Sequence, residues 1–265
     1  LHQRCMTDAS PQNPEAIPAA TVVIFRDNKA GDAPEILMQI RSKTMKFAGG
    51  MAVFPGGRVD DADFALAETQ DFGMPVDEAA HQIAAVRETL EETGLAIGLT
   101  GEVTAARAKA ACARLHEVKA LAPILEEFGW TLDLAQFTPF ARWNPQNERI
   151  PRVYDTRFYL ANVGTGDVEI EADNSETTRL FWVTAQGALD MAEAREIKLI
   201  FPTRRNLERL ALFANFGEAK AQAEAIPVKT IIPQVDDRND KPMLTIMEDA
   251  GYPITSELLE TVMRG

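Results

Sequence analysis

The stretch RETLEETGL, residues 87–95, constrains this chain more than any other because it gathers three carboxylates on one short helix. Residues three and four positions apart share one face of an α-helix, so Glu88, Glu91 and Glu92 would lie side by side. Like charges at that spacing repel each other by about 0.2–0.5 kcal/mol per exposed pair. A hard cation such as Mg²⁺ would turn this repulsion into binding, since it requires several oxygen ligands. Taken alone, however, the stretch is more often a solvated acidic face.

The boundaries of this helix can be predicted from its flanking residues. Ile83, Val86 and Leu90 recur at helical spacing and indicate an apolar stripe. Asp77 is the predicted N-cap, because its carboxylate can accept from the first free backbone N–H groups. Gly94 is predicted to end the helix, since glycine readily adopts the left-handed conformation found there.

The rest of the chain predicts a layered domain. Short β-branched and apolar runs indicate strands at 19–27, 34–42, 51–57, 137–145, 152–163 and 178–183. Helices are expected as a pair within 104–129, interrupted at Pro123, and at 184–197, 202–225 and 255–263. This order of strands and helices favours an α/β or α+β domain with a helical insertion.

Composition excludes several classes of function. The 265 residues carry a formal net charge of −13, which argues against duplex nucleic acid as a partner. A small phosphorylated ligand remains compatible, because a bound cation can invert the local charge. No apolar run approaches the length of about 18 residues that suggests a membrane span, and the N-terminus lacks the apolar middle of a signal peptide. Cys5 and Cys112 are isolated, so a reduced, cytoplasmic protein is expected.

Read together with VFPGG, residues 53–57, the acidic helix resembles the Nudix box, whose pattern is G-x5-E-x7-R-E-U-x-E-E-x-G-U with U an aliphatic residue. The matching positions are Arg87, Glu88, Glu91, Glu92, Gly94 and Leu95. Thr89 departs mildly from the first aliphatic position. The span from Gly57 to Leu95 is 39 residues against 23 in the family, so about 16 are inserted. The family's early Glu, counted back from the Arg, falls on Ala79; either neighbouring Glu78 substitutes for it or the position is lost.

A second motif narrows the resemblance. The segment RSKTMKFAGGMAVFPGG, residues 41–57, places an Arg-Ser pair thirteen residues before Phe54. This spacing is similar to the upstream signature of coenzyme A diphosphatases in the Nudix superfamily, although an exposed strand end would also explain the pair. The interrupted box, the helical insertion and residues 141–163 further resemble the branch typified by peroxisomal Nudix enzymes that act on coenzyme A and its acyl esters.

The resemblance implies a fold and a division of the chain. The expected fold is the Nudix α/β/α sandwich, an α/β class with a mixed β-sheet and additional helical insertions. We expect a flexible N-terminus at 1–17, a Nudix hydrolase domain at 18–225 with its insertion near 102–130, and a C-terminal extension at 226–265 packed on the domain.

The resemblance also implies Mg²⁺-dependent hydrolysis, with Mn²⁺ as an alternative metal. The expected substrate is a nucleoside diphosphate linked to another group, best matched by coenzyme A or acyl-coenzyme A, which would yield 3′,5′-ADP and a 4′-phosphopantetheine. A nucleotide sugar or dinucleotide, or a non-catalytic Nudix-fold ligand sensor, remains the alternative. The partner is then a small nucleotide-type molecule, and the protein either a monomer or a homodimer.

Roles follow from the resemblance residue by residue. The implied metal ligands are the Gly56 carbonyl, Glu88, Glu91 and Glu92. Arg87 would hold a carboxylate in position, which overlaps with a plain ion pair to Glu91. Glu176 is the first candidate for the catalytic base, with Glu148, Glu169 and Glu171 as rivals. Substrate phosphates would meet Arg41, Arg58 and Arg157, and Arg142 and Arg152 are further candidates. Alternatively, Arg157 pairs with Asp155 or with a helix carboxylate. Trp143 and Tyr154 fit either adenine stacking or a buried core, and the core is favoured.

Overall fold

A mixed β-sheet of eight strands forms the centre of the computed structural model, which describes residues 16–28, 33–44, 48–146, 153–163, 177–237 and 241–264. The hydrogen-bonded order is β10 (Thr230–Ile231), β7 (Thr138–Trp143), β8 (Tyr154–Asn162), β1 (Ile17–Arg26), β2 (Glu35–Arg41) and β3 (Ala52–Val53). Two further strands lie off this path: β4 (Gly56–Arg58) pairs with β1, and β9 (Thr177–Thr184) pairs with β2.

Strand β1 lies in the middle of the sheet and is covered on both faces. It runs parallel to β8 and antiparallel to β2. Because successive side chains of a strand point to opposite faces, Val22 and Ile24 enter one core while Val23 and Phe25 enter the other. This two-sided burial explains why the strand is a continuous apolar run rather than an alternating one.

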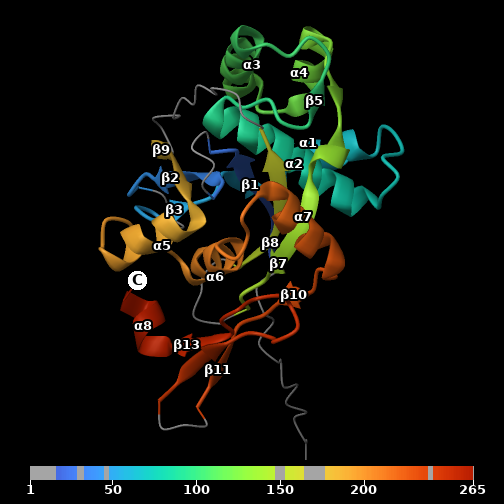
Figure 1. Ribbon diagram of the computed structural model, residues 1–265. Coiled ribbons are helices and arrows are strands. Elements are labelled where there is room, and N and C mark those ends of the chain that lie inside the picture. The colour runs from blue at the N-terminus through green and yellow to red at the C-terminus, as the bar shows by residue number, and fades with distance from the viewer. Residues whose placement is uncertain are drawn as a thin grey trace, which may run out of the picture.

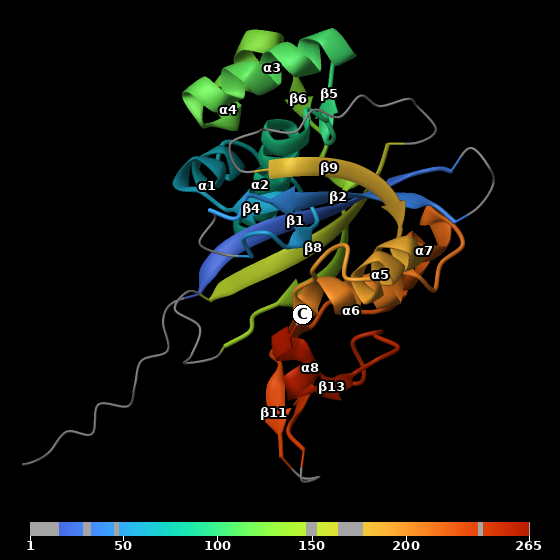
Figure 2. The same ribbon diagram turned by 90° about the vertical axis from the view of Figure 1, so that its left-hand side faces the viewer.

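Helices cover the two faces of the sheet in separate layers (Figures 1 and 2). One face packs against α1 (Asp61–Ala67) and α2 (Val76–Thr93). The opposite face packs against α5 (Ala185–Glu193), α6 (Phe201–Leu210) and α7 (Phe216–Ala225). The arrangement is therefore an α/β/α sandwich around a mixed sheet.

The helical insertion lies outside α2, on the side away from the sheet (Figure 1). It consists of α3 (Ala105–Val118) and α4 (Leu121–Phe128), flanked by the paired strands β5 (Leu99–Thr100) and β6 (Thr131–Leu132) and the short 3-10 helix η1 (Leu134–Gln136). The prediction of two helices is confirmed, but the break falls at Lys119, not at Pro123. Pro123 lies in the first turn of α4, where its missing N–H costs no hydrogen bond.

Helix α2 begins two residues before the position expected from the sequence. Pro75 occupies the N-cap without a side-chain hydrogen bond, so the prediction of Asp77 as N-cap is wrong. Gly94 ends the helix in the left-handed conformation with φ of 72°, as predicted. In the described part of the chain, none of the helices has the length and apolar character of a membrane span.

The C-terminal residues form a small sheet beside α6. It contains β11 (Gln234–Asp236), β12 (Met243–Thr245) and β13 (Ser256–Leu258), followed by α8 (Leu259–Arg264). The helix expected at 255–263 therefore starts later, after a strand, and the helical run expected at 202–225 is divided into α6 and α7. Tyr252 ties this segment to the domain: its hydroxyl accepts from Trp143 Nε1 at 3.0 Å and donates to Asn206 at 2.7 Å.

Candidate functional site

Arg87 lies at the centre of a buried cluster beneath the turn between β3 and α1. Arg87 is 3% exposed, and its guanidinium donates to both Asp63 oxygens, with the shortest bond at 2.8 Å. It also donates to Glu88 Oε1 at 2.7 Å and to the carbonyl of Arg58 at 2.8 Å. Burial alone would lower the pKa of Arg87, but the bonds to Asp63 and the charge of Glu88 raise it overall. Arg87 is therefore a fixed cation that orients Glu88.

Glu92 is held by neutral donors only. It accepts from the Gly56 backbone N–H at 2.8 Å and from Gln39 Nε2 at 2.8 Å. The Gln39 carbonyl oxygen in turn accepts from the Thr177 hydroxyl at 2.7 Å, which fixes the amide. The nearest guanidinium is that of Arg41, whose Nη1 lies 3.9 Å from Glu92 Oε1. Strands β2 and β9 thus position this carboxylate through neutral hydrogen bonds, and the Arg41 guanidinium at the end of β2 lies beyond hydrogen-bond distance.

The glycine turn after β3 packs closely against the backbone of β1 on one side and against the Glu88 carboxyl group of α2 on the other. A Cβ at Gly57 would lie 2.4 Å from the Glu88 carboxyl carbon. A Cβ at Gly56 would lie 2.3 Å from the Ala20 carbonyl oxygen, and the φ of 152° at Gly56 also disfavours other residues. The turn therefore brings backbone groups directly against the Glu88 and Glu92 carboxylates.

The largely buried carboxyl groups of Glu88 and Glu92 favour the protonated form more than ordinary carboxyl groups do. Burial raises the pKa of Glu88 to about 7, with Arg87 opposing and Glu91 adding to the shift. Burial and the charge of Glu88 raise the pKa of Glu92 to about 8. Burial thus outweighs the opposing charges of Arg87 at Glu88 and of Arg41 at Glu92. A divalent cation would reverse both shifts.

The donor set fits a hard divalent cation, because the available ligands are carboxylate and carbonyl oxygens. Within the described residues, no three His, Cys, Asp or Glu side chains already surround a common point. Glu88 is turned toward Arg87, and Glu91 Oε1 lies 2.5 Å from Lys119 Nζ. Ligation therefore requires these side chains to exchange partners.

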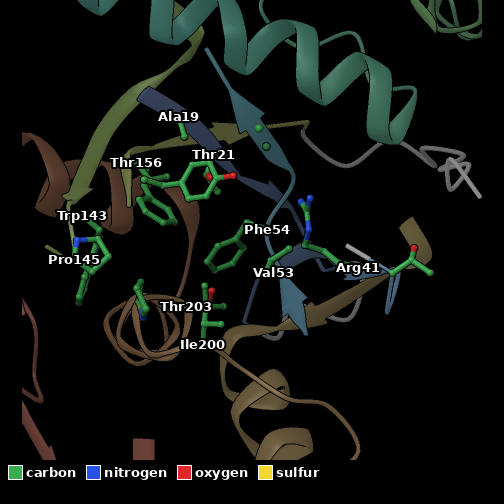
Figure 3. Close-up of a pocket in the computed structure, with 16 residues that line it drawn as sticks. Ala19, Thr21, Arg41, Val53, Phe54, Trp143, Pro145, Thr156, Ile200 and Thr203 are labelled. Carbon is green, nitrogen blue, oxygen red and sulfur yellow. The ribbon is translucent and has the colours of Figure 1, made fainter. Parts of the chain in front are cut away.

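A cavity of about 430 Å³ opens beside Gly56 and Gly57, between the sheet and α6 (Figure 3). Its walls are mainly apolar and include Val53, Phe54, Pro145, Phe158, Ile200 and Pro202. In the view of Figure 3, Arg41 lies on one side, Trp143 and Pro145 on the other, and Phe54 between them. Arg41 is the charged residue among the described lining residues, and its buried Nε has no hydrogen-bond partner among them. The cavity thus combines an apolar floor with one guanidinium, that of Arg41, on the side nearest Glu92.

The family model of the NUDIX domain matches residues 16–120, a range that contains β1, the glycine turn and the acidic helix α2. This chain contains a Nudix domain. The predicted family resemblance and the predicted α/β/α fold are confirmed.

Three known proteins show how far the similarity extends. A Caenorhabditis elegans protein carrying the name nudix hydrolase 7 is 29% identical over 74% of this chain and 64% of its own length. The acyl-coenzyme A diphosphatase NUDT19 of Gallus gallus is 25% identical over 69% of this chain and 63% of its own length. The chain thus spans less than two thirds of either curated relative. The crystal structure of a NUDIX hydrolase from Alicyclobacillus acidocaldarius is 27% identical with a TM-score of 0.66, covering 78% of this chain and 96% of that one.

Asp63 occupies the position of the early Glu in the Nudix box. Counting back from Arg87 pointed to Ala79 instead. Ala79, the position found by that count, is buried without a carboxylate. Glu78 does not substitute for it, because ten residues of helix place it about 15 Å from Glu88. Asp63 lies six residues after Gly57, so counting forward from the glycine would have identified it. The insertion follows Asp63, and folding returns this carboxylate to Arg87.

The structure separates the three arginines expected to meet substrate. Arg41 lines the cavity. The Arg58 side chain is 65% exposed and pairs with Asp60 at 2.8 Å. Arg157 lies at the opposite end of α2, where it binds Glu78 at 2.6 Å and also Asp77; pairing with helix carboxylates was the alternative left open for it.

Of the remaining candidates, the catalytic bases lie outside the described residues and the two aromatic residues line the cavity. The candidate base Glu176 and its rivals Glu148, Glu169 and Glu171 lie outside the described residues. Trp143 is buried and packs edge-on against Tyr252 at 5.6 Å, which is a core role, although it and Tyr154 both border the cavity.

Proposed function

We propose that this protein hydrolyses the pyrophosphate bond of a nucleoside diphosphate linked to another group, using Mg²⁺ or Mn²⁺ bound by Glu88, Glu91 and Glu92. The observation that carries the proposal is the largely buried pair Glu88 and Glu92 beside a glycine turn. Burial raises their pKa values to about 7 and about 8, although Arg87 pairs with Glu88 and Arg41 lies 3.9 Å from Glu92. The bound metal would neutralise the diphosphate and activate a water molecule for attack at phosphorus.

The surrounding residues have separate proposed tasks. Arg87 and Asp63 hold Glu88, while Gln39 and the Gly56 N–H hold Glu92. The Gly56 carbonyl is proposed as a further metal ligand. The absence of a side chain at Gly57 leaves room for the Glu88 carboxylate against the turn.

Arg41 is the favoured phosphate ligand among the arginines. Its guanidinium lines the cavity, and a guanidinium suits a phosphate because its donors form a planar fork. Arg58 stays a weaker candidate, since it is largely exposed and already paired. Arg157 is weaker still because of its place at the other end of α2.

Glu176 remains our proposed base. It directly precedes Thr177, whose hydroxyl bonds Gln39, the residue that holds Glu92. Replacing Glu176 with Gln should reduce turnover strongly without changing metal affinity, which calorimetry with Mn²⁺ would measure. Loss of metal binding instead would assign Glu176 to the metal site.

Coenzyme A or an acyl-coenzyme A is the proposed substrate, cleaved to 3′,5′-ADP and a 4′-phosphopantetheine. Three observations support it: the Arg-Ser motif places Arg41 at the cavity, the cavity walls are mostly apolar, and one relative is named as an acyl-coenzyme A diphosphatase. The apolar walls would suit a pantetheine or acyl chain better than a second sugar.

A substrate panel tests the proposal directly. Purified protein with Mg²⁺ would be given coenzyme A, acyl-coenzyme A, ADP-ribose, NADH and diadenosine polyphosphates, with products identified by mass. We expect the highest kcat/KM for the coenzyme A class. Equal or better turnover of the others would refute the substrate assignment, and nucleotide binding without any hydrolysis would favour a ligand sensor.

Matched arginine variants test the phosphate contact. Arg41→Gln should raise KM for every diphosphate substrate by about tenfold, as for the loss of a charge-assisted hydrogen bond. Arg58→Gln, which removes the same charge from the exposed side of the turn, should change KM by less than about twofold. Equal effects of the two substitutions would contradict the placement of Arg41 at the phosphates.

A further inference from the structure

Glu91 differs from Glu88 and Glu92 because the helical insertion supplies its closest partner. Lys119 Nζ lies 2.5 Å from Glu91 Oε1, and His116 Nδ1 lies 3.5 Å from the same oxygen. Arg87 Nη1 is more distant, at 3.7 Å from Oε2. The insertion thus places an ammonium group against a carboxylate that we assign to the metal.

The insertion is firmly packed on α2, so this contact is not a chance approach of a loose surface side chain. Ala111 and Leu115 of α3 are fully buried in the same core as α2. The Cys112 thiol contacts the Glu91 carbonyl oxygen at 3.6 Å. Figure 1 shows α3 and α4 lying along the outer side of α2. The backbone of residue 119 is therefore held near Glu91, while its long side chain is 63% exposed.

The backbone at Lys119 is unusual for a residue with a side chain. It ends α3 in the left-handed conformation with φ of 56°. The helices on either side in the chain, α2 and α4, end in the same conformation with Gly94 at 72° and Gly129 at 63°. Glycine adopts this conformation at lower cost than lysine. The chain thus has a lysine where its neighbouring helix ends have glycine, and Glu91 is the partner that the lysine side chain reaches.

We propose that Lys119 is a displaceable counter-ion of the metal site. Its ammonium group neutralises Glu91 when no metal is bound, and a divalent cation must displace it in order to use that carboxylate. This inference rests on the proposed role of Glu91 as a metal ligand. The exposed side chain can withdraw into solvent once the metal takes its place.

The test is metal binding in the absence of substrate. Isothermal calorimetry with Mn²⁺ would compare the wild type with Lys119→Met and Lys119→Gly. Both variants should bind Mn²⁺ about two- to fivefold more tightly, as for removal of an exposed ion pair. Metal-free Lys119→Met should also unfold at a lower temperature. Lys119→Gly removes the same ammonium group, but it also relieves the backbone strain of the left-handed conformation. A gain in Mn²⁺ affinity in both variants would therefore identify the lost charge as the cause.

Lys109→Met is the matched control. It removes the same charge from the same helix, ten residues or about 15 Å away. Its Mn²⁺ affinity should remain that of the wild type. Unchanged or weaker binding in the two Lys119 variants, or an equal gain in Lys109→Met, would overturn the proposal. Hydrolysis of coenzyme A by the wild type is measured separately, so either idea can fail without the other.

Discussion

Helix α2 carries carboxylates at both ends, but the two ends differ in how those charges are compensated. At the N-terminal end, Glu78 accepts from Arg157 at 2.6 Å, from the Tyr159 hydroxyl at 2.8 Å and from Gln82 at 3.1 Å. Toward the C-terminal end, Glu92 accepts only from uncharged groups, and its nearest guanidinium is 3.9 Å away.

Under the proposed function, the N-terminal end of α2 has a structural role and the C-terminal end binds the metal. Removing one partner of a buried ion pair is strongly destabilising, whereas a buried carboxylate held mainly by neutral donors already carries the cost of its burial. Burial raises the pKa of Glu92 to about 8 and, despite the ion pair with Arg87, that of Glu88 to about 7. Carboxyl groups with such pKa values gather at functional sites, and we propose that a metal ion completes this one. Substitutions at the two ends should therefore have opposite consequences for stability and for turnover.

The largest effect is expected for Glu92→Gln. Turnover should fall by about a thousandfold or more, which corresponds to about 4 kcal/mol of lost transition-state stabilisation. The unfolding temperature of the metal-free protein should stay the same or rise, because a neutral amide replaces a buried carboxyl group whose nearest guanidinium is 3.9 Å away. Steady-state kinetics and calorimetry check the two parts, and a destabilised but active variant would contradict the account.

Asp63→Asn comes next and should act through Arg87. The buried guanidinium would keep its contact to Glu88 but lose its main countercharge, so the free energy of unfolding should fall by about 3 kcal/mol. Urea denaturation measures this. Asp61→Asn, on the exposed side of the same helix, serves as control and should change it by less than about 0.5 kcal/mol.

Glu78→Gln should show the reverse pattern to Glu92→Gln. Losing the charge that binds Arg157 should cost about 1.5–2 kcal/mol of stability. Because Glu78 lies about 15 Å from Glu88, kcat/KM should change by less than about twofold. A large loss of turnover in a folded variant would mean that this end of α2 also serves the site.

The smallest effect is expected for Thr177→Val. The valine removes the hydroxyl that fixes the Gln39 amide, so stability should fall by about 1 kcal/mol. Turnover should fall only a few-fold, since Gln39 and the Gly56 N–H still hold Glu92. An effect on turnover as large as that of Glu92→Gln would show that the orientation of Gln39 controls the site.

Local patterns predicted much of the fold. The structure confirms the strands that became β1, β2, β7, β8 and β9, the acidic helix with Gly94 as its end, and the pair of helices in the insertion. The single strand expected at 51–57 is instead divided into β3, which pairs with β2, and β4, which pairs with β1. The predicted ends of the elements were less accurate. The acidic helix follows Pro75 rather than Asp77. The Asp77 carboxylate pairs with Arg157 of a distant strand instead of capping the helix.

The contacts between distant segments could not be predicted. Asp63 reaches Arg87 across 24 residues, and Lys119 reaches Glu91 across 28. Neither spacing follows a local rule, since each depends on how the chain between them packs. Arg157 illustrates the same limit, because its strand position gave no means of choosing between substrate and the Glu78 carboxylate.

The most direct test of the account is thermal unfolding with and without Mg²⁺ in the wild type, Glu92→Gln and Glu78→Gln. A ligand at about 100 times its Kd stabilises a folded protein by about 2.7 kcal/mol, which is readily measured as a higher Tm. We expect Mg²⁺ to raise the Tm of the wild type and of Glu78→Gln by similar amounts, and to leave Glu92→Gln almost unchanged. An equal Mg²⁺ shift in Glu92→Gln and the wild type would show that Glu92 does not bind the metal.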